Sequence, residues 1–385
     1  MKTLLVTECP VDVINGTPMY GLPIFIKRYS CFGKLTICAY PSDETVSNPQ
    51  LPNISNVGFV LLKKENSITN MVFNRKFNIK VLKSLIKNSD FVIVHLPSPV
   101  GNHAIALAHK IKKPTFTGVI GCAFESMWYY NWKGKLMAIP AYMSMKRTIL
   151  NSSFAFYVSQ KYLQRKYPCN GPSFGASNVE ISRLDVSKLE DRINKIINMD
   201  LTSRGEIHLA TLGAVNVPYK GFQFVIKAIA ELNKLNGPKF HYHCIGGGDQ
   251  TKLRRLSINK GIENYIHFTG LISKEAVKAL LDSKIDIYIH PSLTEGIPRS
   301  VIEAQSLALP TFGADIPAIR ELVPAQNIFA RKSSIAIFSL LKSLNHDILI
   351  ESAKFGFNNA SNYTSEILDE RRSYFFQEIL KIIRQ

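Results

Sequence analysis

The sequence is poor in acidic residues, in paired cysteines and in long apolar runs. Its 29 Asp and Glu residues stand against 47 Lys and Arg residues, which gives a formal net charge of +18. The six cysteines have no paired spacing, so they indicate a reducing compartment and neither disulfides nor a zinc site. No apolar run approaches the roughly 18–20 residues of a membrane-spanning helix. Glu8 and Asp12 follow the short N-terminal apolar run, which therefore predicts a buried strand and not a signal peptide.

The positive charge is concentrated in the first half of the chain. Residues 1–180 hold 21 Lys and Arg against 8 Asp and Glu, a net charge of +13, whereas residues 181–385 have a net charge of +5. This excess is compatible with an anionic partner of the first half, and equally with a lysine-rich genome composition and no partner. An RNA-binding protein is conceivable from charge alone. We expect no nucleic acid, because no recognition motif of interleaved aromatic and basic residues is present.

Short β-branched runs alternate with helical patterns, and no repeat of 20–50 residues occurs. At 385 residues the chain is long for one hydrophobic core. The predicted fold class is α/β: two Rossmann-like, doubly wound domains with parallel sheets that face a cleft. In the first half we expect strands at 2–7, 34–40, 91–96, 114–120 and 154–159, and helices at 77–89 and 101–113.

The alternation resumes after residues 168–180, which are rich in Pro, Gly, Ser and Asn. Here we expect strands at 206–213, 239–248, 265–270 and 285–290, and helices at 220–235, 250–260, 274–283 and 298–308. The predicted organisation is an N-terminal domain over 1–170, a linker region over 171–205, a C-terminal domain over 206–363 and a final helix over 364–385.

Two carboxylates flank the turn between the last predicted strand and its helix, in the stretch HPSLTEGIPRSVIEAQ. Glu295 follows the strand, and Glu303 lies on the same helical face as Arg299 and Ser300. Free backbone N–H groups at Ser300 and Val301 would attract an anion. A carboxylate at position 303 can accept two hydrogen bonds from a ribose diol. The alternative is a solvated helix residue, against which its apolar neighbours argue.

Two earlier strand-to-helix turns contain further candidates. In IGGGDQ (245–250) the glycines allow a ligand to approach the backbone at the start of a helix, although a simple tight turn has the same pattern. Lys220 stands at the start of another helix, where the helix dipole disfavours a cation. That position suits a phosphate ligand and is also compatible with a surface lysine.

Together these motifs resemble the retaining GT-B nucleotide-sugar glycosyltransferases of family four (glycosyl transferases group 1). EGIPRSVIEA is similar to the E-x7-E motif of that family. YKGFQFVIKAIAEL, IGGGD and FTGLISKEAVKALLDSKIDIYIHPS stand in the family's order and at its spacing. The resemblance is strong from residue 206 to about 325. Residues 134–168 are similar to a branch that works on capsular and other bacterial cell-surface polysaccharides.

The resemblance implies a role for each matching position. Lys220 and Glu295 would be the catalytic residues, the first on the donor diphosphate and the second on hydroxyls of the donor hexose. Glu303 would hold the ribose, Leu271 would lie near the base, and Gly246 would border the donor. The other implied donor-binding residues are Gly296, Ile297, Arg299, Ser300 and Val301.

Two positions depart from the family pattern. Ala214 stands where the family often has an arginine, so one diphosphate cation is missing there. Cys122 stands near the place where many members carry a histidine after the fifth strand. The acceptor-side candidates are therefore Glu125 and His95. The alternative for His95 is a strand-end histidine whose hydrogen bonds are satisfied by the backbone.

The resemblance implies front-face attack, in which the departing phosphate oxygen takes the proton of the acceptor and no protein base is needed. No Asp-x-Asp triplet occurs, so we expect no metal and no cofactor besides the donor substrate, for which a UDP-sugar is favoured. The expected reaction transfers a hexose-type sugar to a glycan or a polyprenyl-diphosphate-linked acceptor. A GT-B sugar-nucleotide epimerase and a non-catalytic GT-B scaffold are the alternatives.

A lipid-linked acceptor would place the enzyme in the cytoplasm, at the inner face of the cell membrane. Residues 127–147 mix aromatic residues with Lys and Arg, and such a segment can lie on an anionic membrane surface. The alternative is an ordinary core helix with a basic outer face.

Overall fold

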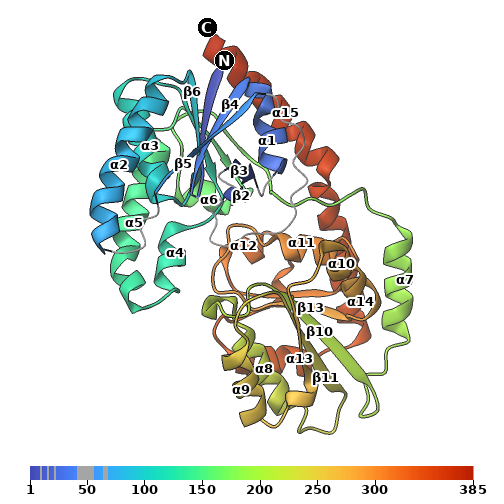
Figure 1. Ribbon diagram of the computed structural model, residues 1–385. Coiled ribbons are helices and arrows are strands. Elements are labelled where there is room, and N and C mark those ends of the chain that lie inside the picture. The colour runs from blue at the N-terminus through green and yellow to red at the C-terminus, as the bar shows by residue number, and fades with distance from the viewer. Residues whose placement is uncertain (9–10, 15–16, 21–22, 41–55, 64–67, 385) are drawn as a thin grey trace. The chain divides into compact units, whose positions relative to one another are not determined.

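The computed structural model describes residues 1–384 except 9–10, 15–16, 21–22, 41–55 and 64–67. The chain divides into two compact units (Figure 1). Unit 1 comprises Met1–Phe124, Ala138–Ala176 and Arg372–Gln385, and unit 2 comprises Glu125–Met137 and Ser177–Arg371. Among the described residues, no helix combines the length and apolar character needed to cross a bilayer.

Unit 1 is built on a parallel sheet with the strand order β5-β4-β1-β6-β7-β8-β9. The strands are β1 (Lys2–Val6), β4 (Lys34–Ala39), β5 (Val57–Leu61), β6 (Phe91–Leu96), β7 (Thr115–Val119), β8 (Phe154–Tyr157) and β9 (Ser173–Gly175). Strands β2 (Val11–Ile14) and β3 (Thr17–Tyr20) form a separate antiparallel pair. The helices are α1 (Pro23–Tyr29), η1 (Ser30–Phe32), α2 (Ile68–Lys87), α3 (Pro99–Lys110), α6 (Tyr162–Lys166) and most of α5 (Trp132–Leu150).

Aromatic side chains fill the core of unit 1. The ring centroid of Phe376, in helix α15 (Ser365–Arg384), lies 5.0 Å from that of Phe32 and 5.8 Å from that of Phe116. The rings of Phe375 and Phe174 are 4.3 Å apart. Buried aromatic pairs of this kind stabilise a core beyond their area alone. The last turns of α15, drawn in red in Figure 1, therefore belong to unit 1, where they lie beside α1.

Unit 2 is built on a second parallel sheet, in the order β12-β11-β10-β13-β14-β15. Its strands are β10 (Glu206–Leu212), β11 (Lys239–Ile245), β12 (Ile266–Gly270), β13 (Ile287–His290), β14 (Thr311–Ala314) and β15 (Ile328–Phe329). Its helices are α4 (Ala123–Trp128, mostly in this unit), α7 (Ser187–Ile197), η2 (Pro218–Lys220), α8 (Phe222–Leu232), α9 (Thr251–Asn259), η3 (Glu263–Tyr265), α10 (Lys274–Ser283), α11 (Arg299–Gln305), α12 (Pro317–Arg320), η4 (Ala325–Asn327), α13 (Ser334–Lys342), α14 (His346–Ala360), η5 (Ser361–Tyr363) and the start of α15.

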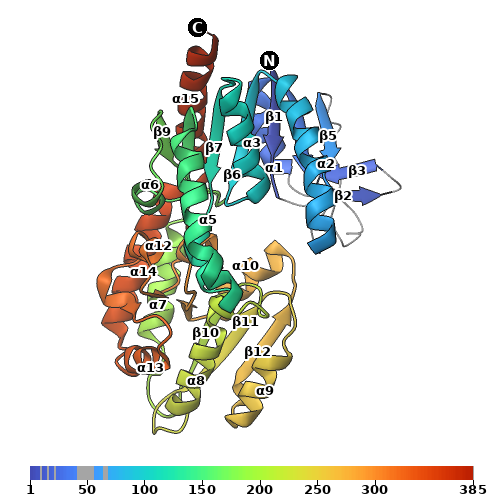
Figure 2. The same cartoon turned by 90° about the vertical axis from the view of Figure 1, so that its left-hand side faces the viewer.

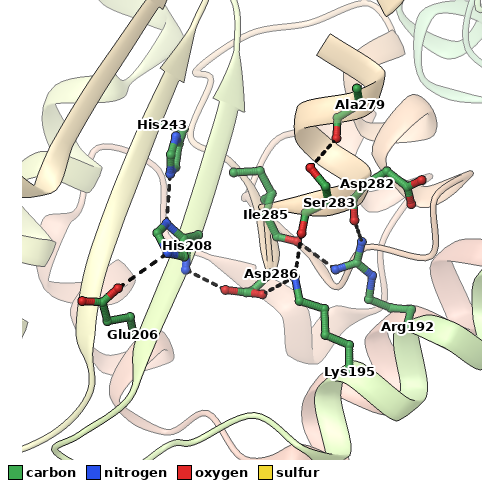
Figure 3. Close-up of polar contacts among 10 residues, drawn as sticks. All are labelled: Arg192, Lys195, Glu206, His208, His243, Ala279, Asp282, Ser283, Ile285 and Asp286. Carbon is green, nitrogen blue, oxygen red and sulfur yellow. Dashed lines mark hydrogen bonds and ion pairs between the residues drawn. The ribbon is translucent and has the colours of Figure 1, made fainter. Parts of the chain in front are cut away.

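Polar contacts fix helix α7 to the sheet of unit 2 (Figure 3). The buried Arg192 donates to the backbone oxygens of Ile285 at 2.8 Å and Asp282 at 3.1 Å. Lys195 forms an ion pair with Asp286 at 2.8 Å. Because Arg192 presents several N–H donors, it satisfies two carbonyl groups that end α10 and precede β13. The predicted linker region thus contains a helix that is anchored on unit 2.

Four histidines gather on strands β10, β11 and β12. His208 Nδ1 lies 3.0 Å from His243 Nε2, a contact drawn in Figure 3, and His241 Nδ1 lies 3.1 Å from His267 Nε2. Burial lowers the pKa of His243 to about 3, and it also lowers the pKa values of His208 and His267. Burial disfavours the charged form of an imidazole, so the fold favours the neutral form of His208, His243 and His267.

The predicted α/β class with parallel sheets is confirmed. The helix predicted at 274–283 is found with those bounds as α10, and the predicted strands lie within one to three residues of those observed. Helix α2 begins at Ile68, earlier than the predicted start at residue 77. Its first half contains asparagines, which have low helix propensity.

Candidate active site

The strand order of unit 2 reverses between β10 and β13, which pair in parallel near the centre of the sheet. Strands β11 and β12 extend the sheet on one side, and β14 and β15 extend it on the other. Open α/β sheets bind ligands outside the carboxyl ends of their strands at such a reversal. The segments that follow β10 and β13 carry Lys220 and Glu295, so the topology brings these two residues together.

Lys220 and Glu295 form a direct ion pair. Lys220 Nζ donates to Glu295 Oε1 at 2.6 Å, and both side chains are largely buried. Gly221, which follows Lys220, has φ of +81°, and a Cβ there would lie 2.2 Å from the carbonyl oxygen of Pro291. Only glycine therefore lets the turn at Lys220 pack against the loop that leads to Glu295.

His290 is a third member of this group that the sequence reasoning left without a role. It ends β13 and is 1% exposed, and its Nε2 lies 3.3 Å from Glu295 Oε1. Neither ring nitrogen has a hydrogen bond to any described residue. Burial alone would raise the pKa of Glu295, but the contact with His290 and the charge of Lys220 outweigh it and lower that pKa to about 2. Glu295 is therefore a carboxylate at neutral pH.

A cavity of about 470 Å³ opens at the carboxyl ends of β10, β11 and β12. At its floor the backbones of two strand ends nearly touch: Gly246 has φ of +144°, and a Cβ there would lie 2.1 Å from Gly213 O. Leu271, 87% exposed, lines the opening. The lining residues are Leu212, Gly213, Ala214, Asn216, Ile245, Gly246, Gly247, Gly248, Gly270, Leu271, Ile272 and Val277. Glycine backbone here admits a ligand that side chains would block.

Glu303 lines a neighbouring cavity of about 410 Å³, which Lys274 and Val277 also border. Val277 borders both cavities, so the two adjoin along α10. Burial raises the pKa of Glu303, although the charges of Arg299 and Lys274 act to lower it. The structure thus separates the predicted donor residues into the Lys220–Glu295 pair, the glycine-lined cavity and the Glu303 cavity.

Known proteins resemble the chain in sequence and in structure. The family model described as glycosyl transferases group 1 matches residues 208–354. Protein CapJ of Staphylococcus aureus is 30% identical over 397 aligned positions, which cover 100% of this chain and 97% of that protein. The chain belongs to the glycosyl transferases group 1 family. The resemblance found in the sequence motifs is confirmed.

Two further comparisons place this group 1 glycosyltransferase among others. A putative colanic acid biosynthesis glycosyltransferase, WcaL of Salmonella typhimurium, is 32% identical over 146 residues, which are 34% of this chain and 35% of that protein. The crystal structure of Anabaena Alr3699/HepE in complex with UDP matches with a TM-score of 0.64 and 13% identity, covering 98% of this chain and 100% of that one. This likeness shows the fold, which is the GT-B class of two Rossmann-like domains.

In this group 1 glycosyltransferase the turn before α11 differs from expectation. Val301 N–H donates to Pro298 O at 3.2 Å, so the prediction of a free amide at Val301 is wrong, because the proline carbonyl closes the first turn. Ser300 contacts the buried hydroxyl of Tyr288, whose pKa burial raises. Gly296 and Ile297 are buried, and Arg299 is exposed.

Of the two acceptor-side candidates, Glu125 contacts the loop after β13. Its carboxylate is buried and accepts a hydrogen bond from Thr294 Oγ1 at 3.1 Å. Thr294 immediately precedes Glu295 in the chain. Through its hydrogen bond with the Thr294 side chain, Glu125 therefore contacts the loop that carries the Glu295 carboxylate. This contact links α4 to the loop after β13 within unit 2.

His95 lies in the core of unit 1. Its Nε2 is 2.9 Å from Tyr29 Oη, and burial, with a smaller effect of Arg28, lowers the pKa of His95 to about 3. A buried, hydrogen-bonded ring agrees with the stated alternative in being satisfied, but at Nε2 the backbone partner expected there is wrong. The partner is a tyrosine side chain, which no sequence spacing indicates.

No group of three or more His, Cys, Asp and Glu side chains among residues that the structure describes is arranged to hold a metal ion.

Proposed function

We propose that this group 1 glycosyltransferase transfers a hexose-type sugar, with retention, from a UDP-sugar to a glycan or a polyprenyl-diphosphate-linked acceptor. The observation that carries the proposal is the Lys220–Glu295 pair beside the glycine-lined cavity. The pair and the cavity are adjacent. Gly213 lines the cavity, and a Cβ on this residue would lie 3.3 Å from Lys220 Cδ. A cation and a carboxylate at one edge of a cavity suit a ligand that joins a diphosphate to a sugar.

Each of the paired residues has a distinct task in this proposal. Lys220 binds the diphosphate, whose negative charge grows as the bond to the sugar breaks, so it stabilises the leaving group. Glu295, ionised at neutral pH, accepts hydrogen bonds from hexose hydroxyls and orients the ring. Glu303 accepts hydrogen bonds from the ribose, and Leu271 covers the base.

The reaction balances without a protein base. The bond between the anomeric carbon and the diphosphate oxygen breaks, and the acceptor oxygen forms a bond to the same face of that carbon. The acceptor proton passes to the departing phosphate oxygen, which leaves as the nucleoside diphosphate. The electrostatic stabilisation of this oxygen is the main contribution required of the enzyme.

Named relatives and neighbours guide the choice of donor and pathway. HepE was crystallised with UDP, and WcaL is described as a glycosyltransferase of colanic acid biosynthesis. Together with the motif resemblance of residues 134–168, they support a UDP-linked donor and a role in cell-surface polysaccharide biosynthesis for this chain.

We further propose that the enzyme is cytoplasmic and binds peripherally to the inner face of the membrane. Helix α5, the long green helix of Figure 2, presents Trp132, Leu136, Ile139 and Met143 at helical spacing, with 68, 71, 64 and 58% of these residues exposed. The outer face of α5 is therefore apolar, whereas an ordinary surface helix is polar there. With the net charge of +13 over residues 1–180, this stripe suits insertion into an anionic lipid surface.

A thermal-shift screen of nucleotide sugars tests the donor. A ligand at 100 times its dissociation constant adds about 2.7 kcal/mol to the unfolding free energy. We expect UDP and UDP-hexoses to raise the melting temperature, and GDP- and CMP-sugars to have little effect. Stabilisation by none of the UDP compounds contradicts the proposal. If the sugar nucleotide is converted without acceptor into one with an inverted sugar stereocentre, the protein is an epimerase. If it binds the donor but transfers sugar to no acceptor, it is a scaffold.

A further inference from the structure

We propose that His290 is a positioning residue that holds Glu295 in place when Lys220 binds the donor diphosphate. The inference rests on the proposed function, because it assigns Lys220 to the diphosphate and Glu295 to the hexose. It goes beyond that function because it explains how the sugar-binding carboxylate keeps its orientation while its cationic partner engages another group.

The contacts of Glu295 divide unequally between its two oxygens. Oε1 has both neighbours, Lys220 Nζ at 2.6 Å and His290 Nε2 at 3.3 Å. Oε2 has no hydrogen bond with any residue in the described part of the chain. A carboxylate offers about four lone-pair positions, so the oxygen without partners is the one available to sugar hydroxyls.

The burial of His290 needs an explanation other than packing. The ring is 1% exposed, yet neither nitrogen has a hydrogen bond among the described residues. Leaving a buried polar group without a partner costs about 1–3 kcal/mol, and an apolar side chain of similar size avoids that cost. The ring packs near Tyr288, with centroids 6.2 Å apart and planes inclined by 22°, which restricts its rotation. A buried imidazole whose nitrogens have no hydrogen-bond partner among the described residues therefore lies beside Glu295.

The 3.3 Å distance between His290 Nε2 and Glu295 Oε1 leaves room for a hydrogen bond to form between them when the donor binds. In the structure Lys220 provides the short hydrogen bond to Oε1, and His290 stands slightly beyond an ordinary one. When Lys220 turns toward a diphosphate, Oε1 loses its cation, and His290 Nε2–H is the remaining donor beside it. A small rotation that aligns Nε2–H with Oε1 then completes the hydrogen bond and keeps Oε2 directed at the sugar.

The test compares two ligands that differ only in the sugar. UDP requires the residues of the diphosphate and nucleoside, whereas a UDP-hexose also requires Glu295. For the full-length enzyme with H290L, we expect the Kd of the UDP-hexose to rise by about 10- to 100-fold, the usual effect of losing a hydrogen bond to a charged group. The Kd of UDP should stay within about twofold. Isothermal titration calorimetry measures both.

Two polar variants distinguish the hydrogen bond of His290 to Glu295 from the space that the ring fills. In H290Q the side-chain amide reaches the place of Nε2, so the Kd of the UDP-hexose should recover toward the wild-type value. In H290N the amide is too short to reach Glu295, and the Kd should resemble that of H290L. H243L removes another buried histidine of the same sheet, on β11, and should change the two Kd values equally or not at all.

Each outcome decides between explanations. Equal weakening of both ligands in folded H290L, or weakening of neither, overturns the assignment. If circular dichroism shows that H290L is unfolded, the comparison of H290Q with H290N decides. Equal Kd values of these two variants for the UDP-hexose overturn the assignment. A wild-type enzyme that binds UDP but no UDP-hexose contradicts the proposed donor instead.

Discussion

Lys220 Nζ and Glu295 Oε1 lie 2.6 Å apart, although 75 positions separate the two residues in the chain. The pair forms where the strand order of unit 2 reverses, between β10 and β13. At 2.6 Å this is a short charge-assisted hydrogen bond, of the kind that is stronger than one between neutral groups. It places a cation and a carboxylate side by side next to the glycine-lined cavity.

Replacing Lys220 and Glu303 should impair the enzyme in different ways. Lys220→Ala should lower kcat by roughly two orders of magnitude, as the loss of one oxyanion-stabilising donor does, because it meets charge that develops in the transition state. Glu303→Gln should mainly raise the donor KM, since the ribose changes little during the reaction. Donor-dependent kinetics measure both effects.

Lys227→Ala is the matched control for Lys220→Ala, because Lys227 is an exposed lysine on the neighbouring helix α8. It should leave kcat unchanged. If folded Lys220→Ala keeps a near-normal kcat, the diphosphate assignment is wrong, and Arg299 becomes the cation to examine. Ala214 offers no replacement charge at the cavity wall.

The sequence predicted nine of the fifteen strands in the described part of the chain and missed β2, β3, β5, β9, β14 and β15. It predicted little of what depends on side-chain partners. Hydrophobic periodicity located α10 with its observed bounds, and the cap residue Ser273 marks where the helix begins. The predicted strand-to-helix turns also placed Lys220 and Glu295 at the same end of one sheet. The sequence did not reveal the role of His290, because burial and unpaired ring nitrogens are properties of packing and leave no periodic pattern.

Two other features escaped prediction for related reasons. The hydrogen bond between Thr294 and Glu125 joins positions 169 residues apart, and no local pattern encodes it. The amide of Val301 was expected to be free, but the turn at Pro298 occupies it. A histidine that directly follows an apolar strand and precedes Pro-Ser would have been the available signal for His290.

The transferase should remain active in the presence of a strong chelator. No Asp-x-Asp triplet occurs in the sequence, and Lys220 can meet the charge of the leaving diphosphate without a divalent ion. The assay compares initial rates with and without excess EDTA. Complete loss of activity that magnesium or manganese restores would show that this expectation is wrong.

Membrane binding should depend on the apolar stripe of α5. The wild-type protein should float with anionic liposomes at low salt and less at high salt, because screening weakens the attraction between basic residues and lipid. Leu136→Glu should reduce flotation strongly, whereas Ile335→Glu, at an equally exposed apolar position on α13, should not. Equal flotation of both variants, or no flotation of the wild type at low salt, contradicts this role of α5.

The free energy of unfolding should fall as the pH drops below about 6.5. His243 has a pKa of about 3 in the folded protein, and the pKa values of His208 and His267 are also lowered. An unfolded histidine binds a proton near pH 6.5, so the unfolded state takes up protons first and becomes more favourable. The contribution of the neutral histidines to the free energy of unfolding is complete above pH 6.5 and is lost progressively as the pH falls toward 3.

Urea unfolding between pH 8 and pH 5 measures this dependence. His243→Gln removes one of the two histidines whose pKa is lowered to about 3, the other being His95, and should make the curve shallower over that range. An unfolding free energy that does not change between pH 8 and pH 5 in the wild type is inconsistent with neutral rings in the sheet.

The stereochemistry of transfer tests the central claim most directly. The enzyme is incubated with UDP-hexoses labelled with ¹³C at the anomeric carbon and with a polyprenyl-linked acceptor fraction, and the one-bond carbon–proton coupling of the product is read by NMR. We predict that an α-linked donor gives an α-linked product, and that Lys220→Ala gives almost none. A β-linked product, or no transfer from any UDP-hexose, contradicts a retaining transferase built on the Lys220–Glu295 pair.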